Sequence, residues 1–65
     1  MKLDKEKFNI ALAEKEMNTA DLARATGYSL NTIREYATLK RNPTTKALGK
    51  IAKVLEVRVI ELIEN

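Results

Sequence analysis

Apolar residues recur along the chain at intervals of three and four, which is the spacing of one face of an α-helix. Alternation typical of strands is hard to find outside residues 56–61. The strongest apolar stripe follows Thr44, a residue type that caps helices. This stripe consists of Leu48, Ile51, Ala52 and Leu55. The pattern predicts a helix from Thr44 to about Leu55 and favours an all-α fold.

Two shorter helices are predicted in the middle of the chain, separated by a glycine. Asn18 can cap the first of them, and Asp21 stands where a capping box places an acid. Gly27 can adopt the left-handed conformation that ends this helix. Ser29 can then cap the next helix. The inward positions of that helix are Ile33, Tyr36 and Ala37.

The two ends of the chain carry weaker helix signals. Asp4 can cap a first helix that ends near residues 14–16. Its inward face holds Phe8, Ala11 and Leu12. A last helix is predicted from Arg58 to Glu64, although Val57 to Ile60 can also be read as a strand. Together these signals predict a compact, all-α bundle of five helices.

The composition limits the chemistry that the chain can perform. Sixty-five residues suffice for one core, so we expect a single domain, residues 1–65. Without cysteine or histidine there is no disulfide, and a zinc site would need carboxylates alone, which structural zinc avoids. The two glycines, Gly27 and Gly49, lie outside any phosphate-binding loop. We therefore expect no enzyme activity, metal, cofactor or small-molecule ligand.

Residues 1–8 lack the apolar stretch of a signal peptide, and the longest apolar run, residues 10–13, is too short to span a membrane. We therefore expect a cytoplasmic protein that does not associate with membranes.

Positive charge is concentrated in the middle of the chain. The net charge is +3, but residues 24–53 hold seven basic residues against one acid, a local charge of +6. The remaining residues sum to −3. A basic middle is typical of a surface that meets an anionic partner, and also of an ordinary solvated surface. Charge alone leaves both interpretations open.

The most informative pattern lies in residues 18–38. Its two helices are joined by too little chain for antiparallel packing, so we expect them to cross steeply. Ala23 supplies the small residue needed where the backbones approach, and Gly27 supplies the turn. The apolar positions beneath them are Leu22, Tyr28, Ile33 and Tyr36.

In this unit and in the spacing of later motifs, the chain resembles the Cro/CI-type helix-turn-helix (Xre-like) family of phage and bacterial transcriptional regulators. The later motifs are Lys40 to Pro43, Ile51-Ala52-Lys53, Leu55, Val57, Val59 and Glu61-Leu62. The resemblance implies a lambda-repressor-like domain in which the helix beginning near Ser29 lies in the major groove of double-stranded DNA.

The resemblance also implies which residues touch DNA. It assigns contacts with base edges to the exposed face of that helix, at Leu30, Asn31, Arg34 and Glu35. It assigns contacts with the DNA backbone to Thr19, Ser29, Lys40, Arg41 and Asn42. The implied function is that of a sequence-specific regulator of phage or mobile-element type, a repressor that binds an operator.

The chain departs from the family at several positions. Leu39 stands where the family usually has a helix-ending glycine, so the helix before it is expected to end differently. Glu16 replaces the usual glycine near the end of the first helix. Thr19 replaces the commoner glutamine, which shortens the reach of that side chain toward DNA.

Two questions about partners stay open at this point. Val59 and Leu62 already fill the expected core positions of the last helix, so Ile60 and Ile63 are additional apolar residues. They favour either a homodimer, formed in solution or only on DNA, or packing within one chain. A domain of this fold can also serve as a protein-interaction module, such as an antirepressor or antitoxin. Such a module would expose an apolar patch on the recognition helix, where Leu30 is the only large apolar residue.

Overall fold

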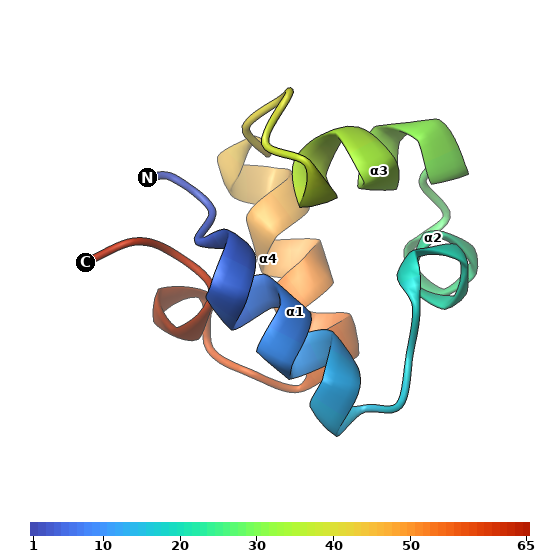
Figure 1. Ribbon diagram of the computed structural model, residues 1–65, viewed down its shortest axis with the longest axis horizontal. Coiled ribbons are helices and arrows are strands. Elements are labelled where there is room, and N and C mark those ends of the chain that lie inside the picture. Colours follow the sequence, from blue (N-terminus) through green and yellow to red (C-terminus); the bar gives the residue numbers. More distant parts are fainter.

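The computed structural model describes residues 1–65 and consists almost entirely of helix. Four α-helices are followed by one turn of 3₁₀-helix. The elements are α1 (Lys5–Glu14), α2 (Thr19–Thr26), α3 (Leu30–Ala37), α4 (Thr45–Leu55) and η1 (Val59–Glu61). α1 and α4 lie at the centre of the view, α3 lies along one edge, α2 lies at another, and both chain ends emerge together (Figure 1).

Each α-helix begins at the capping residue that the sequence predicts. The side chains of Asp4, Ser29 and Thr44 each accept a hydrogen bond from the backbone N–H three residues later. Asn18 and Asp21 form a complete capping box, in which each side chain accepts from the backbone N–H of the other. The predicted helix starts are therefore confirmed.

The predicted fifth helix, Arg58 to Glu64, is wrong. Only Val59–Glu61 is helical, as a single 3₁₀ turn, and the fold therefore has four α-helices. The strand alternative for Val57 to Ile60 is also wrong, because Val59 and Ile60 belong to this turn. Ile63 instead forms an isolated antiparallel bridge with Leu3, which takes the end of the chain out of helical geometry.

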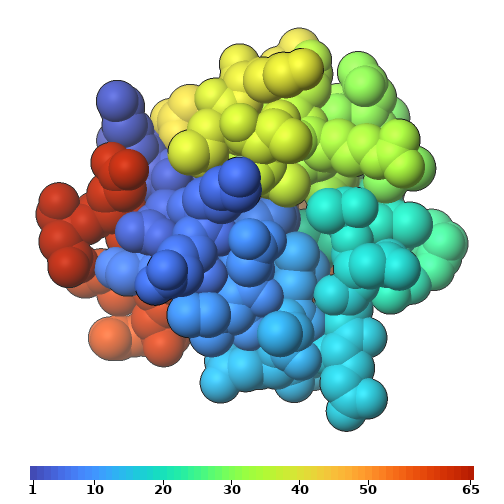
Figure 2. Space-filling view, in the orientation of Figure 1, coloured from blue at the N-terminus to red at the C-terminus, as the bar shows by residue number.

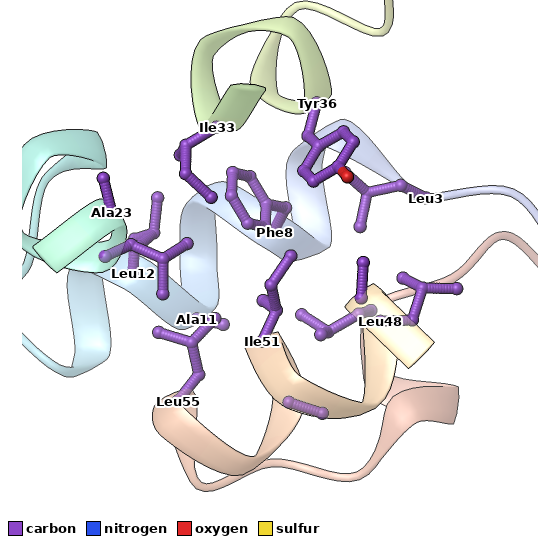
Figure 3. Close-up of a cluster of buried hydrophobic side chains, with 14 residues drawn as sticks. Leu3, Phe8, Ala11, Leu12, Ala23, Ile33, Tyr36, Leu48, Ile51 and Leu55 are labelled. Atoms are coloured by element: carbon purple, nitrogen blue, oxygen red, sulfur yellow. The ribbon is translucent and has the colours of Figure 1, made fainter. Parts of the chain in front are cut away.

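The core draws on all four α-helices and on Leu3 and Leu62 near the chain ends. Phe8 is fully buried and lies between Ile33 of α3 and Ile51 of α4 (Figure 3). The predicted inward positions of the four α-helices are buried, except Ala37, which is half-buried. Leu3, which the helical pattern does not mark, is also buried. The apolar core comprises Leu3, Phe8, Ala11, Leu12, Leu22, Ala23, Ile33, Tyr36, Ala47, Leu48, Ile51, Ala52, Leu55 and Leu62.

Three helices end on residues other than glycine that adopt the left-handed conformation. Glu16, Leu39 and Glu56 have φ angles of 54°, 62° and 57° after α1, α3 and α4. In each case the next backbone N–H reaches back to the last turn, as Lys40 does to the carbonyl of Glu35 at 2.9 Å. α3 therefore ends in the geometry that glycine usually supplies, although the residue is leucine.

None of the helices has the length and apolar character needed to cross a membrane.

Candidate nucleic-acid interface

α2 and α3 form a helix-turn-helix unit around Gly27. Gly27 has a φ of 83°, and its N–H donates to the carbonyl of Ala23 at 2.9 Å, which ends α2. Ala23, the small residue that the sequence pattern singles out on α2, is buried. α2 is seen nearly end-on in Figure 1 whereas α3 runs across the view, so the predicted steep crossing is confirmed.

Thr26 fixes the turn between these helices, and the sequence pattern did not single it out. Its side chain is buried, and Oγ1 donates to the carbonyl of Leu22 at 2.8 Å. The same oxygen accepts the N–H of Tyr28 at 3.3 Å. The one signal in the sequence is a threonine just before a helix-ending glycine, because a threonine hydroxyl can bond to the previous turn of its helix. Thr26 thus joins the end of α2 to the start of α3.

The four predicted base-contacting residues lie on α3 but differ in their freedom to contact a partner. Asn31 and Arg34 are exposed, and neither side chain makes a hydrogen bond or ion pair within the protein. Leu30 is half-buried and packs against the core. Glu35 is half-buried, and its carboxylate lies 3.4 Å from Nε of Arg41. Asn31 and Arg34 are therefore the two α3 side chains best placed for an external partner.

Thr19 and Ser29 stand at the amino ends of α2 and α3. Thr19 is the first residue of α2 and is half-buried. Ser29 is exposed, and its Oγ accepts the N–H of Thr32 at 3.1 Å and donates to the hydroxyl of that residue at 2.9 Å. Both residues therefore lie beside backbone N–H groups that favour an anion.

Lys40, Arg41 and Asn42 form the exposed loop between α3 and α4. Lys40 makes no ion pair, whereas Arg41 is paired with Glu35. The carboxamide of Asn42 points toward the amino terminus: Oδ1 accepts the N–H of Leu3 at 3.2 Å, and Nδ2 donates to the carbonyl of Met1 at 2.8 Å. The structure thus brings the three residues together, with Lys40 the unpaired cation among them.

Most of the positive charge in the middle of the chain is not neutralised by ion pairs. Only Arg24, with Asp21, and Arg41, with Glu35, form ion pairs among the basic residues from 24 to 53. The ammonium of Lys50 lies 5.5 Å from the centre of the Tyr28 ring. The predicted interface keeps a net positive charge, because its Arg34 and Lys40 form no ion pair and only Arg41 is paired, with Glu35.

The two tyrosines pack within the protein. Tyr36 is buried and Tyr28 is half-buried against the core, as their spacing predicts.

The surface beside this unit carries a shallow, open groove and no cluster of potential metal ligands. The groove lies between α2 and α3 and is lined by Ala20, Ala23, Arg24, Gly27, Tyr28 and Leu30. No group of three or more acidic side chains comes close enough to hold a metal ion. The unpaired polar side chains of the predicted contact set are thus Asn31, Arg34 and Lys40, beside the ion-paired Arg24 of the groove and Arg41 of the loop.

One solved structure shows the same fold in a much larger protein. A tyrosine-to-phenylalanine mutant of hydroxyethylphosphonate dioxygenase matches the whole of this chain with a TM-score of 0.82 and 20% sequence identity. The match covers 14% of that protein's chain. No curated protein has significant sequence similarity to this chain. At this identity the likeness shows the fold alone, and dioxygenase chemistry does not follow from it.

The sequence itself matches a family model over nearly its full length. The model describes the Cro/C1-type helix-turn-helix DNA-binding domain and matches residues 7–65. The matched region contains the steep pair α2 and α3, the exposed side chains of α3 and the basic loop after it. The chain therefore belongs to the Cro/C1-type helix-turn-helix DNA-binding domains.

Proposed function

We propose that this chain binds a specific operator in double-stranded DNA by placing α3 in the major groove, and that it represses transcription as a regulator of phage or mobile-element type. The observation that carries the proposal is the pair of exposed and unpaired side chains on α3, Asn31 and Arg34, together with the unpaired Lys40 in the loop that follows α3. A protein that recognises a DNA sequence presents polar side chains whose hydrogen-bonding groups are free to contact bases and phosphates.

Chemistry gives each α3 residue a role. Asn31 can bind an adenine through two hydrogen bonds, and Arg34 can do the same with a guanine. Leu30, held by the core on one side, can offer its remaining surface to a thymine methyl. Glu35 can accept a hydrogen bond from the amino group of a cytosine, and its ion pair with Arg41 competes with that contact. Asn31 and Arg34 therefore carry most of the sequence preference.

Contacts with phosphate supply affinity and orientation. Thr19 and Ser29 would present the amino ends of α2 and α3 to one DNA strand, since those ends carry free backbone N–H groups. Lys40 and Arg41 would bind phosphates after the recognition helix, and each such contact makes binding weaker as salt is added. These contacts position the domain without choosing a sequence.

A homodimer is part of the same proposal. Ile60 is 60% exposed on η1, whereas Ile63 is half-buried against the core. Ile60 would therefore be the main apolar contact between two copies, with Ile63 at its margin. Two copies would read half-sites one helical turn apart. Sedimentation of Ile60→Glu beside the parent, with and without operator, tests the dimer, which is discarded if assembly and affinity are unchanged.

Selection from random DNA duplexes, followed by salt titration of the enriched sequence, tests the function. Arg34→Ala should lose the preference at one base pair, at a cost of about 1–3 kcal/mol. Lys40→Ala should weaken binding to all sequences and make the salt slope shallower by about 1. Lys53→Ala is the matched control, because Lys53 carries the same charge, lies in the last turn of α4 and is not among the predicted DNA-contacting residues. A chain that enriches no sequence and binds without salt dependence would be a protein-interaction module, such as an antirepressor or antitoxin.

A further inference from the structure

Asn42 ties the basic loop to the amino-terminal residues. Its carboxamide uses both its oxygen and its nitrogen, toward the N–H of Leu3 at 3.2 Å and the carbonyl of Met1 at 2.8 Å. An amide side chain that accepts and donates in this way imitates the backbone of a neighbouring strand. The loop and the start of the chain are thereby joined across about forty residues of sequence.

The amino-terminal residues are in turn held by the end of the chain. The N–H of Asp4 donates to the carbonyl of Leu62 at 2.8 Å, and the N–H of Glu64 donates to that of Lys2 at 2.8 Å. We name residues 2–4 and 62–64, which flank the Leu3 and Ile63 bridge, the terminal ribbon. The buried side chains of Leu3 and Leu62 anchor this ribbon in the core. The terminal ribbon is therefore held in a fixed position, and so is the Asn42 side chain that is bonded to it.

The terminal ribbon and the loop lie side by side on the molecular surface. Figure 2 shows the first residues between the end of the chain and the loop that follows α3. A surface depression between the ribbon and the loop is lined by Lys2, Leu3, Leu39, Arg41, Asn42 and Glu64. Residues of both segments therefore border the same depression.

The other end of the loop is fixed to α3. The N–H groups of Lys40 and Arg41 both donate to the carbonyl of Glu35, at 2.9 and 3.3 Å. Lys40 and Arg41 thus lie between two fixed points, the end of α3 and Asn42. Fixing a loop before it binds lowers the entropy lost on binding.

We propose that Asn42 is a positioning residue that holds Lys40 and Arg41 in place for phosphate binding by bonding to the terminal ribbon, and not itself a DNA ligand. The proposal rests on the DNA-binding function proposed above. It differs from the sequence-based assignment of Asn42 to the DNA backbone, and the two assignments make different predictions for the salt dependence of binding.

The discriminating variant is Asn42→Ala, which removes no charge. If Asn42 positions the loop, the variant should lower affinity for every sequence by about 3- to 10-fold and make the salt slope shallower, since Lys40 and Arg41 then meet phosphates less often. Combined with Lys40→Ala, it should cost less than the two single losses together. A direct hydrogen bond to phosphate would instead leave the slope unchanged and give additive losses, which would overturn the proposal, as would unchanged affinity.

Asn31→Ala is the matched control, because it makes the same substitution at an exposed asparagine of α3 that has no internal partner. It should lose preference at one base pair and keep the salt slope of the parent. Thermal unfolding of each variant confirms that binding is compared between folded proteins.

Hydrogen exchange of the Leu3 amide tests the contact without DNA. In Asn42→Ala this amide should exchange at least about tenfold faster, while that of Ile51 inside α4 should keep its rate. An unchanged Leu3 rate would overturn the proposal. If the parent binds no duplex, the proposed function fails, and the Leu3 measurement still decides whether Asn42 holds the loop.

Discussion

The carboxylate of Glu35 lies 3.4 Å from the guanidinium Nε of Arg41, so two residues assigned to different DNA contacts from the sequence face each other in the protein. Both side chains remain partly exposed, at 31% for Glu35 and 58% for Arg41, and solvent screens their attraction. The pair still reduces the positive charge that the loop presents to phosphate. Glu35 is therefore expected to limit binding to DNA of any sequence.

Glu35→Gln should raise affinity for random-sequence DNA several-fold, because it removes a repulsive charge and frees Arg41 for phosphate. The slope of the logarithm of affinity against the logarithm of salt concentration should become steeper by up to about 1. Fluorescence anisotropy with labelled duplexes over a salt series measures both quantities.

Glu61→Gln is a fitting control, because Glu61 faces Arg58 at 3.9 Å on η1 and the substitution makes the same charge change. It should alter the salt slope much less. Equal effects of the two variants would mean that net charge, and not the Glu35 and Arg41 pair, governs affinity.

Leu39→Gly should stabilise the protein by about 1 kcal/mol. At a φ of 62° the left-handed backbone is unfavourable for leucine, whereas glycine adopts it freely. For a domain of this size the midpoint of thermal unfolding should rise by about 4–8 °C. Leu39→Ala tests the cause, since it removes the half-exposed side chain but keeps the penalty. Stabilisation by alanine as large as that by glycine would point to the exposed leucine and not to the backbone.

Thr26→Val should destabilise the protein by about 1–3 kcal/mol, because the N–H of Tyr28 then loses its partner in a partly buried turn. It should also weaken binding to all DNA sequences, since the turn sets the angle between α2 and α3. Urea denaturation and duplex binding measure the two effects. Thr45→Val, an exposed threonine in the first turn of α4, should change stability by less than about 0.5 kcal/mol.

The ion pair of Lys15 and Glu56 should make stability depend on pH in the acid range. A hydrogen bond from Lys15, and then its positive charge, lower the pKa of Glu56, and desolvation acts in the opposite direction. A pKa lowered by folding stabilises the protein above the unfolded-state pKa, and this gain is lost as pH falls through the folded-state pKa. Lys15→Gln should therefore be less stable than the parent at neutral pH but equally stable in acid.

An NMR titration of the Glu56 carboxyl checks the cause of this dependence. The pKa should rise toward its ordinary value in Lys15→Gln, and added salt should shrink the difference between the two proteins. A Glu56 pKa that is the same in both proteins would rule out Lys15 as its cause.

Signals that act over a few residues predicted most of the fold. Asn18, Ser29 and Thr44 bond to backbone groups three residues away, and Ile33 and Ile51 belong to helical stripes, so neighbouring sequence suffices to place them. The α2 and α3 unit was predictable for the same reason, because Gly27 and its surroundings specify a short turn.

Contacts between distant parts of the chain account for what the sequence pattern missed. Ile63 pairs with Leu3, and that contact replaces the helix predicted for Arg58 to Glu64. The partners of Asn42 lie about forty residues away, so the family resemblance implied a contact with the DNA backbone and the neighbouring sequence gave no sign of an internal one. Glu35 and Arg41 are close in sequence, but their pairing depends on the left-handed Leu39 between them.

The terminal ribbon has a consequence for the order of events during folding. Its two halves come from opposite ends of the chain. Bringing them together closes the longest loop in the fold and therefore loses the most loop-closure entropy. The helices, which rely on nearby residues, can form and dock earlier. A chain caught before the ribbon closes would already display its recognition helix but would lack the anchored loop. Full affinity for DNA, rather than binding itself, should therefore be reached only at the last step of folding.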